Sequence, residues 1–180
     1  MTKKLTYGGD IGTICQMAYV VEDIHAAIDW WIRKSGVGPW FLLDSFGSPD
    51  HIYRGKPNTA NVVIAMSFAG NMNIELLQPL DDEPSVYRET IDKVGYGFHH
   101  FGIAQENIEE EVARRIARGE VLAHRAQVPT GGSVAYFEGG EGAPGFVELI
   151  PVTPGMDAGF TRFWEQTRDW DGKEPVRSFL

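Results

Sequence analysis

The chain alternates between apolar segments typical of strands and amphipathic segments with helical spacing. Residues 13–21 are apolar and rich in Val, Ile and Tyr, which predicts a buried strand. In residues 24–35 the apolar side chains recur at helical spacing, which predicts an amphipathic helix that Asp23 caps and Gly36 ends. The chain therefore opens with a strand followed by a helix.

Further strands complete this first unit. We expect them at residues 40–43, 60–68 and 72–78, with a short turn between the last two. Residues 44–58 are rich in Gly, Pro, Asp and Ser, which predicts a loop. Residues 11–80 are thus expected to form one βαβββ module.

A linker and a second set of the same elements follow. Residues 81–96 are expected to be a linker that contains one helix, and residues 97–153 a second βαβββ module whose helix Asn107 caps. The strands of this module are expected at residues 98–104, 121–128, 133–138 and 145–151. Residues 154–180 lie outside the repeat. We expect a C-terminal helix and tail that pack over the module surface or a neighbouring subunit, with a lid over a pocket as the alternative.

Similarity between the two modules supports this division. Residues 16–24, Gln-Met-Ala-Tyr-Val-Val-Glu-Asp-Ile, resemble residues 100–108, His-Phe-Gly-Ile-Ala-Gln-Glu-Asn-Ile, at an offset of 84. Residues 73–77 and 146–150, near the ends of the two modules, each place a Glu inside an apolar strand. The chain therefore looks like two copies of one supersecondary unit.

Composition limits the classes of function. The 180 residues are 43% hydrophobic and 12% aromatic, which is enough for a buried core. A formal net charge of −9 without a cluster of Lys and Arg argues against a nucleic-acid partner and favours a small-molecule or protein partner. The single cysteine, Cys15, allows no internal disulfide, and no segment matches a signal peptide or a membrane span. We expect a cytoplasmic protein without membrane association.

The repeat places four side chains with metal-binding atoms at matched positions. Gln16 and His100 lie on the strands that open the modules, and Glu75 and Glu148 on the strands that close them. Imidazole, carboxylate and amide oxygen all bind divalent cations, and strands hold such ligands rigidly. A single Glu in an apolar strand also fits a solvent-facing position. Two at matched places favour a cation or a hydrogen-bond network, because a buried unpaired carboxylate is costly.

These strands resemble the vicinal oxygen chelate superfamily, which includes glyoxalase I, methylmalonyl-CoA epimerase, extradiol dioxygenases and fosfomycin or bleomycin resistance proteins. The resemblance covers about residues 11–153. It rests on residues 16–24 and on Asn73-Ile-Glu-Leu-Leu-Gln-Pro-Leu, Gly97-Phe-His-His-Phe-Gly-Ile and Gly145-Phe-Val-Glu-Leu-Ile. It implies an α+β fold in which two tandem βαβββ modules form a U-shaped, partly open mixed β-barrel around a metal site.

The resemblance also implies a ligand set for one divalent ion such as Mn, Co, Ni, Zn or Fe. The positions that correspond to the family's metal ligands are Gln16, Glu75, His100 and Glu148. His99 matches the family's double-His strand, but alternation along a strand predicts that it faces away from His100. By the same rule Cys15 is expected to point away from Gln16 as an inert core residue.

The implied activity is that of a metal-dependent isomerase, epimerase or lyase of the glyoxalase type. It would act on a small carbonyl or acyl substrate through a chelated, enolate-like intermediate. Glu148 is the expected proton shuttle and Glu75 its counterpart. Candidates for binding the substrate are Tyr136, His51 and Arg54, together with His124 and Arg125.

Two alternatives stay open, a ring-cleaving dioxygenase and a non-catalytic binding protein of the resistance type. Extradiol dioxygenases resemble the chain less, since they use two His and one carboxylate around iron. Methylmalonyl-CoA epimerases carry a further glutamate on the middle strand of the first module, whereas residues 59–66 contain no carboxylate, so that enzyme's substrate is not implied. A homodimer is expected from Trp30, from the aromatic residues of the tail helix and from the family's habit of pairing modules between chains.

Overall fold

The structure is a computed structural model that describes residues 3–142 and 145–180. The strands are β1 (Ile14–Val20), β2 (Trp40–Phe46), β3 (His51–Tyr53), β4 (Lys56–Asn58), β5 (Val62–Ala69), β6 (Met72–Pro79), β7 (Gly97–Gln105), β8 (Leu122–Gln127), β9 (Ser133–Glu138), β10 (Phe146–Pro151) and β11 (Val176–Ser178). The helices are α1 (Ile24–Ser35), α2 (Val86–Val94), α3 (Ile108–Ala117) and α4 (Pro154–Arg168).

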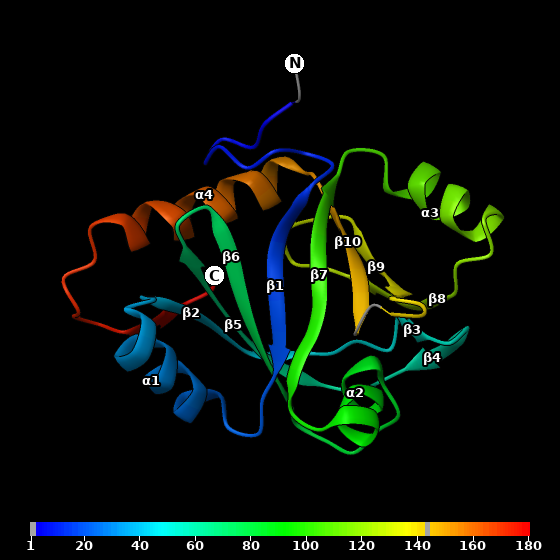
Figure 1. The fold of residues 1–180 in the computed structure, drawn as a ribbon, viewed down its shortest axis with the longest axis horizontal. Coiled ribbons are helices and arrows are strands. Elements are labelled where there is room, and N and C mark those ends of the chain that lie inside the picture. The colour runs from blue at the N-terminus through cyan, green and yellow to red at the C-terminus, as the bar shows by residue number, and fades with distance from the viewer. Residues whose placement is uncertain (1–2, 143–144) are drawn as a thin grey trace.

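Within the described ranges the strands form one mixed sheet of eleven members, flanked by the helices (Figure 1). The strand order is β11-β2-β5-β6-β1-β7-β10-β9-β8-β3-β4, so the sheet is open and has β11 and β4 at its edges. The expected α+β fold with a partly open mixed sheet and a C-terminal helix is confirmed.

The antiparallel pair β1 and β7 runs through the middle of the sheet, and the pairing on its two sides is alike (Figure 1). β1 pairs in parallel with β6, and β7 pairs in parallel with β10. β5 and β9 then pair antiparallel with β6 and β10. The strands that carry the candidate ligands are therefore neighbours, as the metal hypothesis requires, while the module boundaries remain a prediction.

Residues 51–58 form a hairpin that extends the edge of the sheet beyond β8, so the prediction of a loop is wrong here. β3 and β4 pair across a turn at Arg54 and Gly55, which both have positive φ, and β3 also pairs with β8. Strands of three residues within a turn-forming composition leave no periodic signal in the sequence. The short strand β11, also unexpected, pairs in parallel with β2 at the other edge.

The predicted caps of α1 and α3 differ in the contacts that they make. Asp23 Oδ1 accepts a hydrogen bond from the Ala26 amide at 2.9 Å, and Gly36 ends α1 in the left-handed conformation with φ of 66°. Asn107 stands at the N-cap of α3, but its side chain makes no capping hydrogen bond. Asn107 therefore occupies the predicted cap position, but its side chain does not make the capping contact. Acidic side chains in the first turn complement the helix dipole instead: Glu109, Glu110 and Glu111.

The C-terminal helix α4 packs over the sheet face opposite to the one that α1 and α3 cover. The Phe163 ring stacks on Phe41 of β2 with centroids 4.1 Å apart, and Phe160 contacts Phe68 of β5 edge-on. Phe179, next to β11, packs against Phe163. The tail thus packs over its own chain, which was one of the two packing arrangements expected. No helix among the described residues has the length and apolarity needed to cross a membrane.

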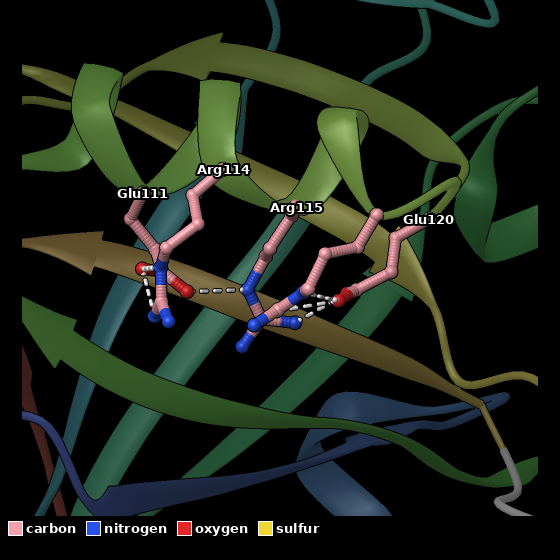
Figure 2. A network of polar contacts seen from close by, with 5 residues as sticks. Glu111, Arg114, Arg115 and Glu120 are labelled. Atoms are coloured by element: carbon pink, nitrogen blue, oxygen red, sulfur yellow. Dashed lines mark hydrogen bonds and ion pairs between the residues drawn. The ribbon is translucent and has the colours of Figure 1, made fainter.

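A cluster of acidic and basic side chains fixes α3 and the segment that follows it (Figure 2). Glu111 is only 7% exposed and accepts hydrogen bonds from Arg114 and Arg115. Arg115 also donates to Glu120 at 2.8 Å, and its guanidinium lies over the Phe137 ring of β9. Burial favours the neutral form of Glu111, but the hydrogen bonds from the two arginines outweigh it and lower its pKa. Glu111 is therefore part of the packing of α3 and not of a fully solvated helix face.

Glu111→Gln tests this role. The variant leaves Arg114 and Arg115 with a weaker acceptor, so its free energy of unfolding should fall by about 1–3 kcal/mol relative to the parent. The folded-state pKa of Glu111 is lowered, so its charge stabilises the protein above the ordinary carboxyl pKa of about 4.3. The deficit should therefore be full at neutral pH and vanish as pH falls through the folded pKa. Urea unfolding at several pH values measures it, with the exposed Glu110→Gln as the matched control; equal stability of both variants at pH 7 contradicts the role.

Candidate metal centre

The predicted ligands lie on β6, β1, β7 and β10, which are neighbours in the sheet. These strands bring the ligands to one face of the sheet. Gly102 of β7 lies opposite Gln16 of β1 and opposite Glu148 of β10. Ala18 of β1 lies opposite the other two ligands, on β6 and β7. Residues directly opposite one another project to the same side of a sheet. The register therefore places four side chains together: Gln16, Glu75, His100 and Glu148.

His100 Nε2 lies at the centre of this group. It is 3.1 Å from Gln16 Oε1, 3.0 Å from Glu148 Oε2 and 3.4 Å from Glu75 Oε2. The ligand atoms of the two carboxylates and the imidazole all lie within 4.8 Å of one another. None of the four residues is more than 5% exposed. The geometry is that of a compact, buried set of one nitrogen and three oxygen donors.

The Gln16 amide is held with its oxygen toward His100. Its Nε2 donates to Asn73 Oδ1 of β6 at 3.0 Å. Asn73 is in turn oriented because its Nδ2 donates to the Ser67 carbonyl at 3.2 Å. With the amide nitrogen engaged, Gln16 Oε1 is the atom that faces the centre.

A chain of hydrogen bonds fixes which nitrogen of His100 carries the proton. The Val86 carbonyl can only accept, so His99 Nε2, 3.2 Å away, is the donor in that contact. Burial, followed by the proximity of His100, lowers the pKa of His99 well below its usual value, so its ring is neutral and its Nδ1 is an acceptor. His99 Nδ1 lies 2.7 Å from His100 Nδ1, which must then donate. With the proton on Nδ1, a His100 ring that binds a cation directs its Nε2 lone pair at the centre.

The expectation that His99 faces away from His100 is wrong, and a β-bulge is the reason. Between Ala18 and its neighbour Tyr19 on β1, the pairing register skips one residue of β7, which is His99. A bulge places two successive side chains on the same side of the strand. The rings of His99 and His100 consequently meet with centroids 5.0 Å apart.

β1 has a matching bulge at Cys15, where the register with β7 shifts between Ile14 and Gln16. Cys15 therefore packs in the same cluster as Ala18, on the Gln16 side of the strand, and the expectation that it points away is wrong. Burial raises the pKa of its thiol to about 11, so the inert core role holds. The two bulges occupy equivalent places in the repeat, directly before Gln16 and His100.

The donor set fits a divalent cation. Glu75 Oε2 is buried, and within the described part of the chain it has no hydrogen-bond partner; the 3.4 Å approach of His100 Nε2 lacks hydrogen-bond geometry. Burial, and then the nearby Glu148 charge, raise the pKa of Glu75 well above its ordinary value. A lone pair of His100, an amide oxygen and two carboxylates that face one point repel one another unless a positive charge lies between them. Oxygen and imidazole donors in this number suit Mn, Fe, Co, Ni or Zn.

The ligands border a cavity of about 50 Å³. Most of its wall is apolar and comes from β5, β10, α4 and the residues around β11. Among its members are Ile64, Met66, Ile150, Met156, Phe160 and Phe179. The polar part of the wall includes Tyr136 and His124. The centre thus faces a largely apolar space that is partly open near Pro129.

The structure separates the predicted substrate-binding residues. Tyr136 of β9 lies opposite Glu148 and lines the cavity. His51 is buried behind His124, with ring centroids 5.8 Å apart, and is not part of the described wall. Arg54 lies outside the cavity, where it forms ion pairs with Glu89 and Glu138, each at 2.7 Å. Of these three residues, only Tyr136 is brought to the ligands.

Gly102, near the centre, was not in the predicted set. At Gly102 a Cβ atom would lie 2.6 Å from Gln16 Oε1 and 2.7 Å from Ile150 Cδ1, so glycine leaves room between Gln16 and Glu148. Its place in the repeated strand, two residues after His100, is the signal that could have found it. His124, a predicted candidate for orienting the substrate, also lies in the cavity wall.

Comparisons with known proteins bear on the family and the fold. Residues 15–137 match the family model described as Glyoxalase/Bleomycin resistance protein/Dioxygenase superfamily. No curated protein sequence matches the chain. A hypothetical protein from Bacillus halodurans superposes with a TM-score of 0.59 and 22% identity, over 78% of this chain and 94% of that one.

Two methylmalonyl-CoA epimerases have the same fold. The Mycobacterium tuberculosis protein gives a TM-score of 0.59 with 18% identity, over 88% of this chain and 96% of its own. A Streptomyces coelicolor variant in complex with 2-nitronate-propionyl-CoA gives 0.58 with 13% identity, over 81% and 97%. At these identities the likeness establishes the fold alone.

His99→Phe tests whether the hydrogen-bond chain prepares His100 for a cation. Phenylalanine keeps a ring beside Tyr87 but removes the acceptor for His100 Nδ1–H, so the dissociation constant for Co²⁺ should rise about 10- to 100-fold. Calorimetric titration of chelator-treated protein measures it, and far-UV circular dichroism checks the fold. His25→Phe, an exposed histidine on α1, is the matched control. Cobalt binding by His99→Phe at the parent affinity would show that His99 does not orient the ligand.

Proposed function

This chain belongs to the glyoxalase/bleomycin resistance protein/dioxygenase superfamily, and on that premise we propose that it is a divalent-metal-dependent isomerase, epimerase or lyase. It moves a proton next to a carbonyl group of a small carbonyl or acyl substrate. The observation that carries the proposal is the convergence of two buried carboxylates, an imidazole and an amide oxygen beside a largely apolar cavity.

Four residues hold the cation in this proposal: Gln16, Glu75, His100 and Glu148. A bound divalent ion supplies Lewis acidity, which polarises a substrate carbonyl and makes the adjacent C–H more acidic. The chain keeps the ligands in place through the Asn73 contact to Gln16 and the His99 contact to His100. The buried surroundings exclude bulk water from the site.

Glu148 removes the proton and Glu75 is its counterpart. The two glutamates stand on β10 and β6, separated in the sheet by the central pair β1 and β7. They can therefore approach one substrate carbon from two sides, which deprotonation followed by reprotonation requires. Tyr136, opposite Glu148 in the register, supports the orientation of the substrate beside that carboxylate.

The ligand set favours this function over the two alternatives. Ring-cleaving iron enzymes use two histidines and one carboxylate, whereas this site has one imidazole, two carboxylates and an amide. A binding protein without catalysis has no need of two buried carboxylates at a cation site. The methylmalonyl-CoA epimerases share the fold, but residues 59–66 lack the further carboxylate, so their substrate is not carried over.

Glu148→Gln separates cation binding from proton transfer. The amide oxygen still coordinates, so the variant should keep most of its cobalt, while the lost base should slow proton exchange by about 10²–10⁴-fold. Exchange is followed by ¹H NMR in D₂O with small molecules that carry a carbonyl beside a hydroxyl group. Glu22→Gln, exposed at the end of β1, should exchange at the parent rate. A Glu148→Gln variant that holds cobalt and exchanges at the parent rate would move the base elsewhere, with Glu75 next to be replaced.

We also propose that the protein is a homodimer located in the cytoplasm. Trp30 is 50% exposed on α1 and stacks edge-on with Trp31, which offers an aromatic surface for a second copy. Sedimentation at micromolar concentration should give twice the chain mass of 20.0 kDa. Trp30→Glu should shift the protein toward the monomer, while Ile116→Glu, equally exposed on α3, should not. A parent protein of single-chain mass contradicts the dimer.

A further inference from the structure

The cavity beside the candidate ligands has a second polar wall that the proposed function leaves unused. We propose that the cavity takes an uncharged substrate with a further hydroxyl or carbonyl oxygen, and that His124 positions this substrate by a hydrogen bond to that oxygen. This inference rests on the proposed function, since it names the substrate class and a positioning residue of the same site.

His124 has unused hydrogen-bonding capacity at the cavity. It is 3% exposed, and in the described residues neither of its ring nitrogens has a partner with full hydrogen-bond geometry; the Ile52 backbone makes only a weak contact with the ring. Buried polar groups in native proteins are almost always paired, so an imidazole without such a partner calls for an explanation. Its neighbours are three aromatic rings, whose centroids lie 5.5 Å (Tyr136), 5.8 Å (His51) and 6.4 Å (Tyr87) from the centroid of the His124 ring. A ligand oxygen in the cavity supplies the missing partner.

The protonation state of His124 suits an uncharged partner. Burial, followed by the nearby His51, lowers the pKa of His124 to about 4. At neutral pH the ring is therefore neutral, with one N–H donor and one acceptor nitrogen. A hydroxyl group can use either of them and a carbonyl oxygen can accept from the N–H.

The charges around the cavity exclude an anionic substrate. Within the described wall the only acidic side chains are the candidate ligands, Glu75 and Glu148, and no Lys or Arg reaches it. Two carboxylates already balance a divalent cation. A substrate carboxylate or phosphate would then add an unpaired negative charge to a largely apolar space, at a cost of several kcal/mol. Proton transfer from an uncharged substrate to Glu148, in contrast, leaves the total charge of the site unchanged.

The size of the cavity points to a small substrate, or to the small reacting end of one. A volume of about 50 Å³ accommodates the centres of roughly four water-sized atoms, at 10–15 Å³ for each. The vicinal oxygens of the substrate lie toward Gln16 and Glu148, and the third oxygen toward His124. Apolar side chains such as Met66 and Phe160 surround the carbon skeleton.

Three probe molecules of similar size separate the parts of this inference. Dihydroxyacetone is uncharged and carries the third oxygen, hydroxyacetone lacks that oxygen, and pyruvate is anionic. Each is titrated into cobalt-loaded protein, with binding measured by calorimetry and by the visible spectrum of the cobalt ion. Dihydroxyacetone should bind at least about 10-fold more tightly than pyruvate, a preference that desolvation of the carboxylate imposes.

Variants of His124 test its positioning role. His124→Phe should weaken dihydroxyacetone binding by about 3- to 10-fold, the worth of one hydrogen bond, and should leave hydroxyacetone within about twofold. His124→Gln, which keeps a donor and an acceptor, should restore most of the loss. A purely structural role for His124 would instead weaken both probes together in His124→Phe.

The outcomes distinguish this inference from the function on which it rests. Parent protein that takes up no cobalt overturns the proposed function and the inference together. Cobalt uptake with pyruvate bound as tightly as dihydroxyacetone, or with no binding of dihydroxyacetone, overturns only the substrate class. Parallel weakening of dihydroxyacetone and hydroxyacetone in His124→Phe, without rescue in His124→Gln, overturns the role of His124.

Discussion

Three oxygen donors and one nitrogen lone pair converge on a single buried point, and most of the structure serves to hold them there. Left without a positive charge, these atoms repel one another, and Glu75 in particular has its charged form disfavoured by burial and by Glu148. Such an arrangement persists only because the surrounding sheet is rigid. The central strands β1 and β7, each flanked by a parallel neighbour, supply that rigidity.

Paired β-bulges explain how a regular sheet can direct so many polar groups inward. An unbroken strand alternates its side chains between faces, so His99 could not reach His100. The bulge at His99 turns both imidazoles to the same side and allows a hydrogen-bond chain from Val86 to end at the His100 lone pair. The equivalent bulge at Cys15 buries a thiol in place of a second imidazole. The first module therefore provides the amide of Gln16 as a candidate ligand. The second provides the imidazole of His100, which the neighbouring His99 orients.

The C-terminal helix and β11 give the site its chemical character. Phe160 and Phe179 close the cavity over the ligands, and the described wall carries no basic side chain. Low polarity strengthens the electrostatic effect of a cation on a substrate carbonyl and penalises any charge that remains unpaired. A reaction in which a proton moves between an uncharged substrate and a carboxylate fits these conditions, because the net charge of the cavity does not change.

Local patterns in the sequence were enough to predict the order of the longer strands and the helices, and the four candidate ligand residues whose side chains converge. The helix of residues 24–35, with Asp23 and Gly36 at its ends, and the repeat that matches Gln16 with His100 depend on local spacing, which sequence periodicity records. The hairpin of β3 and β4 and the strand β11 were hidden, because three-residue strands depend on their partners and not on a pattern of their own. Only the tertiary structure decided that His99 turns toward His100, that Arg54 is held in surface ion pairs, and that His124 faces the cavity. Each of these depends on pairing register or on contacts between residues far apart in the chain, and neither quantity is encoded in local periodicity.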